Sequence, residues 1–179
     1  SVIVDNYQGG RLAAQFLYGR GFRNPGFVGE AARQAYAIPA TELRLKGFCD
    51  WFAEQNIAVD KKNIWLGEFT EGKADAGIRA TIMRADRPDC VFASSDLIAI
   101  RLMRIAVENG IQINRELGLI GFDDLDISEY LNLATVSQSL DESGRLAAEM
   151  VLDRLRDPER ASRKAIVPLN IMNRGYVGA

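Results

Sequence analysis

The sequence predicts an α/β fold of three layers, with a mainly parallel sheet between two layers of helices. Short apolar runs alternate with stretches of helical periodicity along most of the chain, and successive runs are separated by single helices. This order gives parallel strands with helices on both faces of the sheet. The 179 residues are 47% hydrophobic and 26% charged, which is typical of a soluble globular protein of one domain or slightly more.

The first four expected strands are short apolar runs bounded by glycine, proline or charged residues, at 2–4, 27–29, 64–66 and 90–93. Between them, apolar residues recur every three or four positions, which predicts helices at 11–18, 41–56 and 74–82. We interpret Gly9 and Gly10 as part of a turn before the first helix, and Thr41 as the N-cap of the second.

The helix expected at 97–109 is apolar around most of its circumference. Only Arg101, Arg104 and Glu108 form a narrow polar stripe. A helix needs one apolar stripe to cover a sheet, so the surplus predicts a second partner, most simply another copy of the chain across a two-fold axis.

A fifth strand, residues 117–122, ends in two adjacent carboxylates, Asp123 and Asp124. Ligands of open parallel sheets bind just beyond the carboxyl ends of the strands, so we expect Asp123 to face a small polar ligand. The two carboxylates could instead be an acid/base pair of an enzyme. Adjacent strand residues point to opposite faces, however, and no nucleophile accompanies them, so we expect no enzyme.

The C-terminal part continues the pattern less regularly. After a loop that runs through Tyr130, residues 135–138 are expected to be extended and residues 140–155 helical, with Asp157-Pro158 ending the helix. Two final extended segments, 165–168 and 171–172, are expected to form an antiparallel hairpin or two edge strands.

The composition excludes several classes of function. The chain has no histidine, which removes Ser-His-Asp and Cys-His catalysis and every His-ligated metal site. Cys49 and Cys90 are too far apart in sequence for a zinc site, and we expect them to be reduced core residues of a cytoplasmic protein. No nucleotide-binding motif is present, so no cofactor is expected.

Charge and hydropathy exclude others. The net charge of −2 gives no basic field for nucleic acid. No apolar run approaches the length of a membrane span. Ser1 leads directly into an apolar strand, so we expect no signal peptide in this stretch, and the missing initiator Met suggests a trimmed chain.

Four side chains of different chemistry each follow a different strand, namely Arg44, Phe69, Ser95 and Asp123. Parallel strands end at one edge of the sheet, so the pattern brings these groups toward one rim. A cation, a ring, a hydroxyl and a carboxylate suit a sugar, a nucleobase or a similar polar metabolite. Each also has an ordinary interpretation: a solvated arginine, a core ring or a helix cap.

An ordered set of short motifs spans nearly the whole chain: Asp5-Asn6, Gly9-Gly10 with Ala13, Gly21-Phe-Arg23, Arg44-x-x-Gly47-Phe48, Pro88 with Phe92-Ala93, Ser95-Asp96 with Ala99, Gly121-Phe-Asp-Asp124 and Thr135-Val-x-Gln138. In order and spacing this set resembles the LacI/GalR family of bacterial transcription regulators. The resemblance implies a periplasmic-binding-protein-like core of type I, with two α/β subdomains joined by three crossovers and an effector in the cleft.

The resemblance also implies how the chain divides. Residues 1–139 would be the second, C-terminal subdomain. Residues 140–157 would be a helix of the incomplete first subdomain, and residues 158–179 would return to the second. Operator DNA would be bound only by an N-terminal helix-turn-helix domain outside this chain, as a dimer through helix 97–109. We expect the helix at 140–157, which lacks its usual sheet, to dock on a neighbouring chain or to lie in a non-native position.

Carried over residue by residue, the resemblance implies a ligand site made of Arg44, Phe69, Ser95, Asp96, Asp123 and Gln138. Arg44 and Asp123 match positions that hydrogen-bond the effector, and Gln138 lies at a crossover beside the cleft. Ser95 stands where the family usually has Asn, so the effector could differ from a simple hexose. The implied function is effector sensing by a transcription regulator, and a periplasmic sugar-binding protein of an ABC transporter is the alternative.

Overall fold

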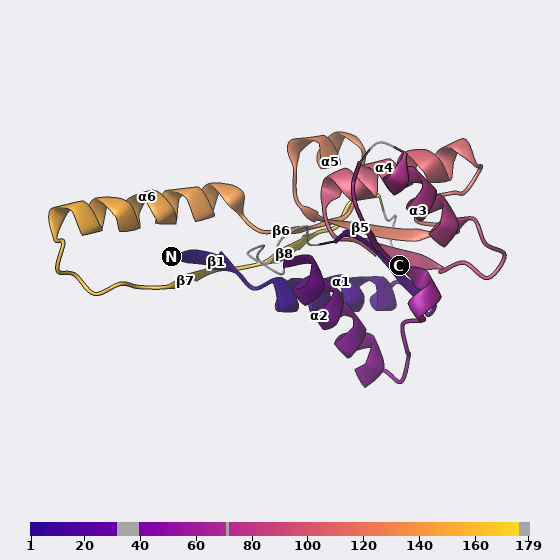
Figure 1. The fold of residues 1–179 in the computed structure, drawn as a ribbon, viewed down its shortest axis with the longest axis horizontal. Helices are drawn as coiled ribbons and strands as arrows, with labels where there is room; N and C mark the ends of the chain where they lie inside the picture. The colour runs from indigo at the N-terminus through magenta and orange to yellow at the C-terminus, as the bar shows by residue number, and fades with distance from the viewer. Residues whose placement is uncertain (32–39, 71, 176–179) are drawn as a thin grey trace.

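The computed structural model describes residues 1–31, 40–70 and 72–175 and is built around a sheet of six strands (Figure 1). The strand order is β3-β2-β4-β5-β6-β8, and every neighbouring pair is parallel except β6 and β8. The strands are β2 (Pro25–Glu30), β3 (Ile64–Gly67), β4 (Cys90–Ala93), β5 (Gly118–Asp123), β6 (Thr135–Ser137) and β8 (Asn170–Met172). The mainly parallel sheet predicted from the sequence is therefore confirmed.

Helices cover both faces of this sheet. On one face lie α1 (Asn6–Gly19) and α2 (Ala40–Glu54), and on the other α3 (Lys73–Ile82) and α4 (Asp96–Glu108). A short helix, α5 (Asp126–Tyr130), replaces part of the loop expected after β5, and a 3₁₀ turn, η1 (Lys61–Asn63), precedes β3. The three-layer α/β/α arrangement is the predicted one.

Neighbouring residues of a strand contribute to two separate hydrophobic cores, because successive side chains point to opposite faces of the sheet. Phe27, Phe92 and Ile120 pack under α1 and α2, whereas Val28 and Val91 pack under α3 and α4. All five side chains are fully buried. Double-sided burial explains why the strands appear in the sequence as continuous apolar runs rather than alternating ones.

The first helix begins earlier than predicted. Asp5 caps it by accepting a hydrogen bond of 2.9 Å from the backbone N–H of Gln8, and Gly9 and Gly10 lie inside the helix rather than in a turn. Glycine is needed there for packing. A Cβ atom on Gly10 would stand 1.9 Å from the carbonyl oxygen of Arg44 in α2. The two helices therefore cross at backbone contact.

Three elements stand apart from the six-stranded sheet. β1 (Val2–Val4) pairs in parallel with β7 (Ala165–Val167), and α6 (Leu140–Arg156) lies along this two-stranded sheet (Figure 1). None of the residues of α6 is buried. Of the two alternatives predicted for the last strands, the hairpin is wrong and the pair of edge strands is confirmed: β7 joins β1, while β8 forms the antiparallel edge beside β6.

The two cysteines lie on the α1–α2 side of the sheet, Cys90 buried in β4 and Cys49 half-buried on α2. Among the described residues, no helix combines the length and the apolar character needed to cross a membrane.

Candidate functional site

Three of the predicted site residues meet at the carboxyl end of the sheet. The side-chain amide Nε2 of Gln138 donates a 2.8 Å hydrogen bond to Oδ1 of Asp123, and Nη1 of Arg44 lies 3.9 Å from the same oxygen. The Arg44 side chain is 11% exposed and that of Asp123 is 21% exposed. The group is therefore largely sheltered from water while its carboxylate remains accessible.

The guanidinium of Arg44 is held from several sides. Its Nε donates a 2.8 Å hydrogen bond to the side-chain oxygen of Asn6, and Nη1 donates a hydrogen bond to the carbonyl oxygen of Ser94. Its carbon Cζ stacks 3.5 Å above the ring of Phe122. Burial lowers the pKa of Arg44 to about 10, against the opposing effect of Asp123. The role of Asn6 was missed in the sequence, where it appeared only as part of the Asp5-Asn6 motif.

Asp123 has an unusual backbone conformation and a raised pKa. Its φ of 119° lies in a region that favours glycine. Burial and, to a smaller extent, the nearby Asp96 raise the pKa of the Asp123 carboxyl to about 6, although Arg44 acts in the opposite direction. Perturbed carboxyl groups of this kind gather at functional sites.

The neighbouring carboxylate faces a different partner. Asp124, with a φ of 60°, accepts a 2.8 Å hydrogen bond from Nη1 of Arg174, and both side chains are about one-fifth exposed. Asp123 and Asp124 therefore do not share partners, as the alternation of strand residues predicts.

Ser95 and Asp96 lie at the start of α4, and both make contacts within the protein. Ser95 is the N-cap, and its hydroxyl accepts a 3.4 Å hydrogen bond from the N–H of Ile98. Asp96 was predicted as part of the ligand site, and its side chain is fully buried in the structure. It accepts hydrogen bonds from the hydroxyls of Ser128 and Thr135, each at 2.6 Å. Asp96 therefore belongs to the structure behind the site.

Phe69 packs with the core on the α3–α4 face of the sheet. Its ring meets that of Trp65 edge-on at 5.5 Å between centroids, and the guanidinium carbon of Arg101 lies 5.8 Å from its centre. These contacts differ from those of Arg44 and Asp123, so the structure does not draw Phe69 into their group.

A cavity of about 500 Å³ opens beside Asp123. It lies between the end of β5 and the connection from β6 to α6. Its lining is strongly acidic and comprises Asp123, Asp124, Leu125, Asp126, Ser137, Ser139, Leu140, Asp141 and Glu142. The residues after Asp124 were missed in the sequence because the turn into α5 and the start of α6 carry no motif of their own. Within the described residues, no cluster of side chains suited to a metal ion is found.

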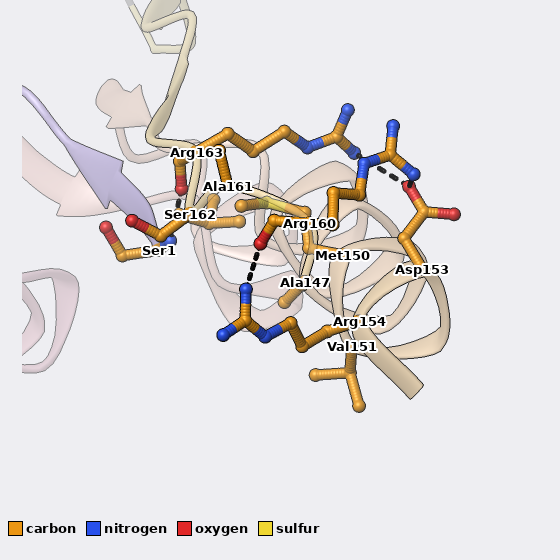
Figure 2. Close-up of a pocket in the computed structure, with 11 residues that line it drawn as sticks. Ser1, Ala147, Met150, Val151, Asp153, Arg154, Arg160, Ala161, Ser162 and Arg163 are labelled. Carbon is orange, nitrogen blue, oxygen red and sulfur yellow. Dashed lines mark hydrogen bonds and ion pairs between the residues drawn. The ribbon is translucent and has the colours of Figure 1, made fainter. Parts of the chain in front are cut away.

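A second hollow, of about 480 Å³, lies under α6 (Figure 2). Ala147, Met150 and Val151 of the helix line it together with Ser1 and the segment 160–163. Around it, the amino group of Ser1 donates a 2.7 Å hydrogen bond to the carbonyl oxygen of Arg163, and Arg160 forms a 3.0 Å ion pair with Asp153. None of the six predicted site residues belongs to its lining.

Comparison with known proteins matches residues 14–175 to the family described as "Periplasmic binding protein-like domain". The HTH-type transcriptional repressor PurR of Klebsiella pneumoniae is 29% identical over 179 residues, covering 98% of this chain and 51% of the repressor. The chain spans about half the length of the curated relatives it matches.

Two solved structures are also similar. A complex of the transcriptional regulator CelR with cellobiose is 26% identical, with a TM-score of 0.83 over 97% of this chain and 52% of CelR. A LacI family regulator from Enterococcus faecium with bound ribose is 25% identical, with a TM-score of 0.82 over 97% of this chain and 63% of that one. The relatives named here are regulators, which agrees with the prediction that the chain is not an enzyme. The chain therefore belongs to the periplasmic binding protein-like domain family, in the form found in LacI-type transcription regulators.

Proposed function

We propose that this chain is the effector-sensing and dimerisation part of a bacterial LacI/GalR-type transcription regulator. The observation that carries the proposal is the group of Arg44, Asp123 and Gln138 at the carboxyl end of the sheet, beside an open cavity. Gln138 follows β6 and precedes α6, so the group sits where the chain leaves the six-stranded sheet. A ligand held there can influence how the two parts of the protein are arranged.

The charges of the site favour an uncharged, hydroxyl-rich effector such as a sugar. The guanidinium of Arg44 is already occupied by Asn6, the Ser94 carbonyl and Asp123. Carboxylates dominate the adjacent cavity, and they would repel a phosphate ester. Sugar hydroxyls, by contrast, can donate to Asp123 and accept from the amide of Gln138. The cellobiose and ribose bound to the two similar regulators are of this chemical kind.

We further propose that α6, β1 and β7 belong to a first subdomain whose remaining part lies outside this chain. The apolar hollow under α6 and the absence of buried residues in that helix support this division. The relatives are about twice as long as this chain, so ample sequence is available to cover this face. Under this division β1 and β7 join the first subdomain, although residues 1–139 and 158–179 were expected in the second.

We place the dimer contact on α4 and on the adjacent α5. Leu97 and Val107 of α4 are 67% and 65% exposed, and Ile127 and Tyr130 of α5 are 44% and 84% exposed. Charged side chains of the same helix are paired within the chain, since Arg104 lies 2.6 Å from Asp75 of α3. An apolar surface of this kind suits a second copy of the chain across a two-fold axis.

Operator DNA would be bound by a helix-turn-helix domain of the complete protein, which would act in the cytoplasm. The PurR relative is an HTH-type transcriptional repressor, which supports this proposal over the transport alternative. Effector binding would shift the equilibrium between two arrangements, changing DNA affinity by about 5–150-fold.

The test uses the full-length protein and DNA from upstream of its own gene. Thermal-shift titrations with ribose, cellobiose and other neutral saccharides, together with their phosphate esters, would identify the effector, and fluorescence anisotropy would follow DNA release. We expect at least one neutral sugar to raise the melting temperature and to change DNA affinity, and Asp123→Ala to abolish that response while DNA binding persists. A response confined to phosphate esters would overturn the effector class. If the full-length protein does not bind DNA, the proposal that it is a transcription regulator is wrong.

A further inference from the structure

Asp123, the carboxylate of the proposed effector site, lies in a turn with strained backbone. Asp123 and Asp124 both have positive φ, 119° and 60°. Residues other than glycine adopt such conformations only when the surrounding structure holds them there, because the conformation is intrinsically unfavourable. Some group in the structure must therefore hold this turn, and through it the direction of the Asp123 carboxylate.

The carboxylate of Asp96 makes the contacts required. Its Oδ2 accepts a 2.9 Å hydrogen bond from the N–H of Leu125, the residue directly after the turn. Its Oδ1 accepts a 2.6 Å hydrogen bond from the hydroxyl of Thr135. That hydroxyl oxygen in turn accepts a 3.3 Å hydrogen bond from the N–H of Asp124. One buried side chain of α4 thus fixes both the backbone after the turn and the group that binds the turn itself.

The sequence of β5 leaves room for this contact. A Cβ atom on Gly121 would stand 2.2 Å from Oδ1 of Asp96, closer than real atoms approach. Gly121 lies two residues before Asp123 on the same strand, so the Asp96 carboxylate rests against the backbone that leads to the site. Ser128 of α5 donates a 2.6 Å hydrogen bond to Oδ2 of the same carboxylate, whereas the N–H of Asp124 in the turn is bonded to Thr135.

We propose that Asp96 is a positioning residue of the effector site, which holds the Asp123–Asp124 turn so that the Asp123 carboxylate faces the effector without Asp96 touching it. The inference rests on the proposed function, because it concerns the same ligand site. It explains why a carboxylate at this position can be fully buried and yet matter for binding.

The charge of Asp96 gives a readout that a purely structural role would not move. Two titratable groups face Asp123 from the packed helices. Arg44 of α2 lowers the pKa of Asp123, the carboxylate of Asp96 on α4 raises it, and a hydrogen bond from the Asp96 backbone lowers it. Removing the charge of Asp96 while keeping its shape should lower the pKa of Asp123. If the effector needs the ionised carboxylate, the loss of effector affinity on acidification should then begin at a lower pH.

The experiment compares two matched hydroxyl variants of the full-length protein, Thr135→Val and Ser128→Ala, by calorimetry with ribose and with cellobiose. Both variants remove a hydrogen bond to Asp96, but only the Thr135 hydroxyl also accepts the N–H of Asp124 in the turn. We expect Thr135→Val to weaken binding by about tenfold and Ser128→Ala to leave it within about twofold of wild type. Equal losses in the two variants would overturn the positioning role.

Asp96→Asn and Asp96→Ala complete the test, with DNA binding as proof of folding. The isosteric Asn should keep affinity within about threefold at pH 7.5 and shift the acid limb of binding to lower pH, whereas a folded Ala variant should lose about tenfold or more. The proposal would be overturned if the Asn variant lost as much effector affinity as the Ala variant and its affinity fell with acidification at the same pH as in wild type. That result would indicate direct contact between Asp96 and the effector. Wild-type protein that binds neither these sugars nor any other neutral saccharide would overturn the proposed function itself.

Discussion

Gln138 and Asp123 are joined at the point where the chain leaves the six-stranded sheet, with 2.8 Å between the amide Nε2 of the former and Oδ1 of the latter. Ser139, the next residue, has a φ of 47° and opens directly into α6. This hydrogen bond therefore links the carboxylate at the candidate site to the connection that leads into α6, which with β1 and β7 forms what we call the α6 arm. Any ligand that competes for Asp123 must also affect this connection.

Replacing Gln138 with Met should weaken the link between effector binding and DNA release more than it weakens binding. Met keeps much of the volume but donates no hydrogen bond, so we expect effector affinity to fall by about threefold to tenfold. The change in DNA affinity caused by saturating effector should fall further. Anisotropy titrations with and without effector measure both quantities. Gln112→Met, an exposed position in the loop after α4, is the control and should change neither.

Replacing Asp123 with Asn should stabilise the protein at neutral pH. Because the folded-state pKa is raised to about 6 from 3.8, the folded state binds more protons than the unfolded state between these values. This group therefore favours unfolding above pH 6, by up to about 3 kcal/mol, and has no such effect below about pH 4. Urea unfolding of wild type and variant at pH 7.5 and pH 4 measures the difference. A gap of the same size at both values would contradict the prediction.

The crossing of α1 and α2 should tolerate no added methyl group. A Cβ atom on Gly47 would stand 2.0 Å from the carbonyl oxygen of Tyr7, so Gly47→Ala must push the helices apart. We expect a loss of about 1–3 kcal/mol in unfolding free energy and weaker effector binding, because Arg44 lies one turn away on α2. Gly19→Ala at the end of α1 is the control, since a Cβ atom there meets nothing within 4 Å and should leave stability unchanged or slightly raised. Equal stability of the two variants would contradict this packing.

The same crossing shows where sequence reasoning stops. Gly9 and Gly10 were interpreted as a turn because glycine often breaks helices, whereas here glycine permits backbone contact with a helix more than thirty residues away. The strands were predictable because double-sided burial leaves continuous apolar runs in the sequence. The pairing of β7 with β1 was not, since three-residue strands carry too little pattern to choose a partner.

The site residues also differ in how far the sequence predicts them. Asp123 and Arg44 follow from strand ends and a helix start, which are local features of the sequence. The burial of Asp96 and the packing of Phe69 against Trp65 depend on contacts made by other elements. A capping motif such as Ser95-Asp96 does not reveal whether the Asp side chain faces solvent or interior. Only the glycine at 121, which makes room for the carboxylate, carried a hint of the outcome.

The exposed apolar surface of α4 and α5 leads to a prediction about assembly. Leu97→Lys should convert a dimeric full-length protein to monomers and weaken operator binding, because a charge would be buried at the contact. Light scattering after size-exclusion chromatography measures the mass directly. Leu66→Lys, on the edge strand β3 and 39% exposed, is the control and should leave the mass unchanged. A dimer that survives Leu97→Lys would move the contact away from α4.

The α6 arm should be the least stable part of the 179-residue chain on its own. Its helix has no buried residue and packs mainly on the two short strands β1 and β7, so little apolar burial opposes its opening. In hydrogen–deuterium exchange we expect the amides of α6 to exchange within seconds, while those of β4 and β5 remain protected for hours. In the full-length protein the apolar hollow under α6 should be covered, and the same amides should become protected. Strong protection of α6 in the isolated chain would show that the helix is stabilised without the proposed first subdomain.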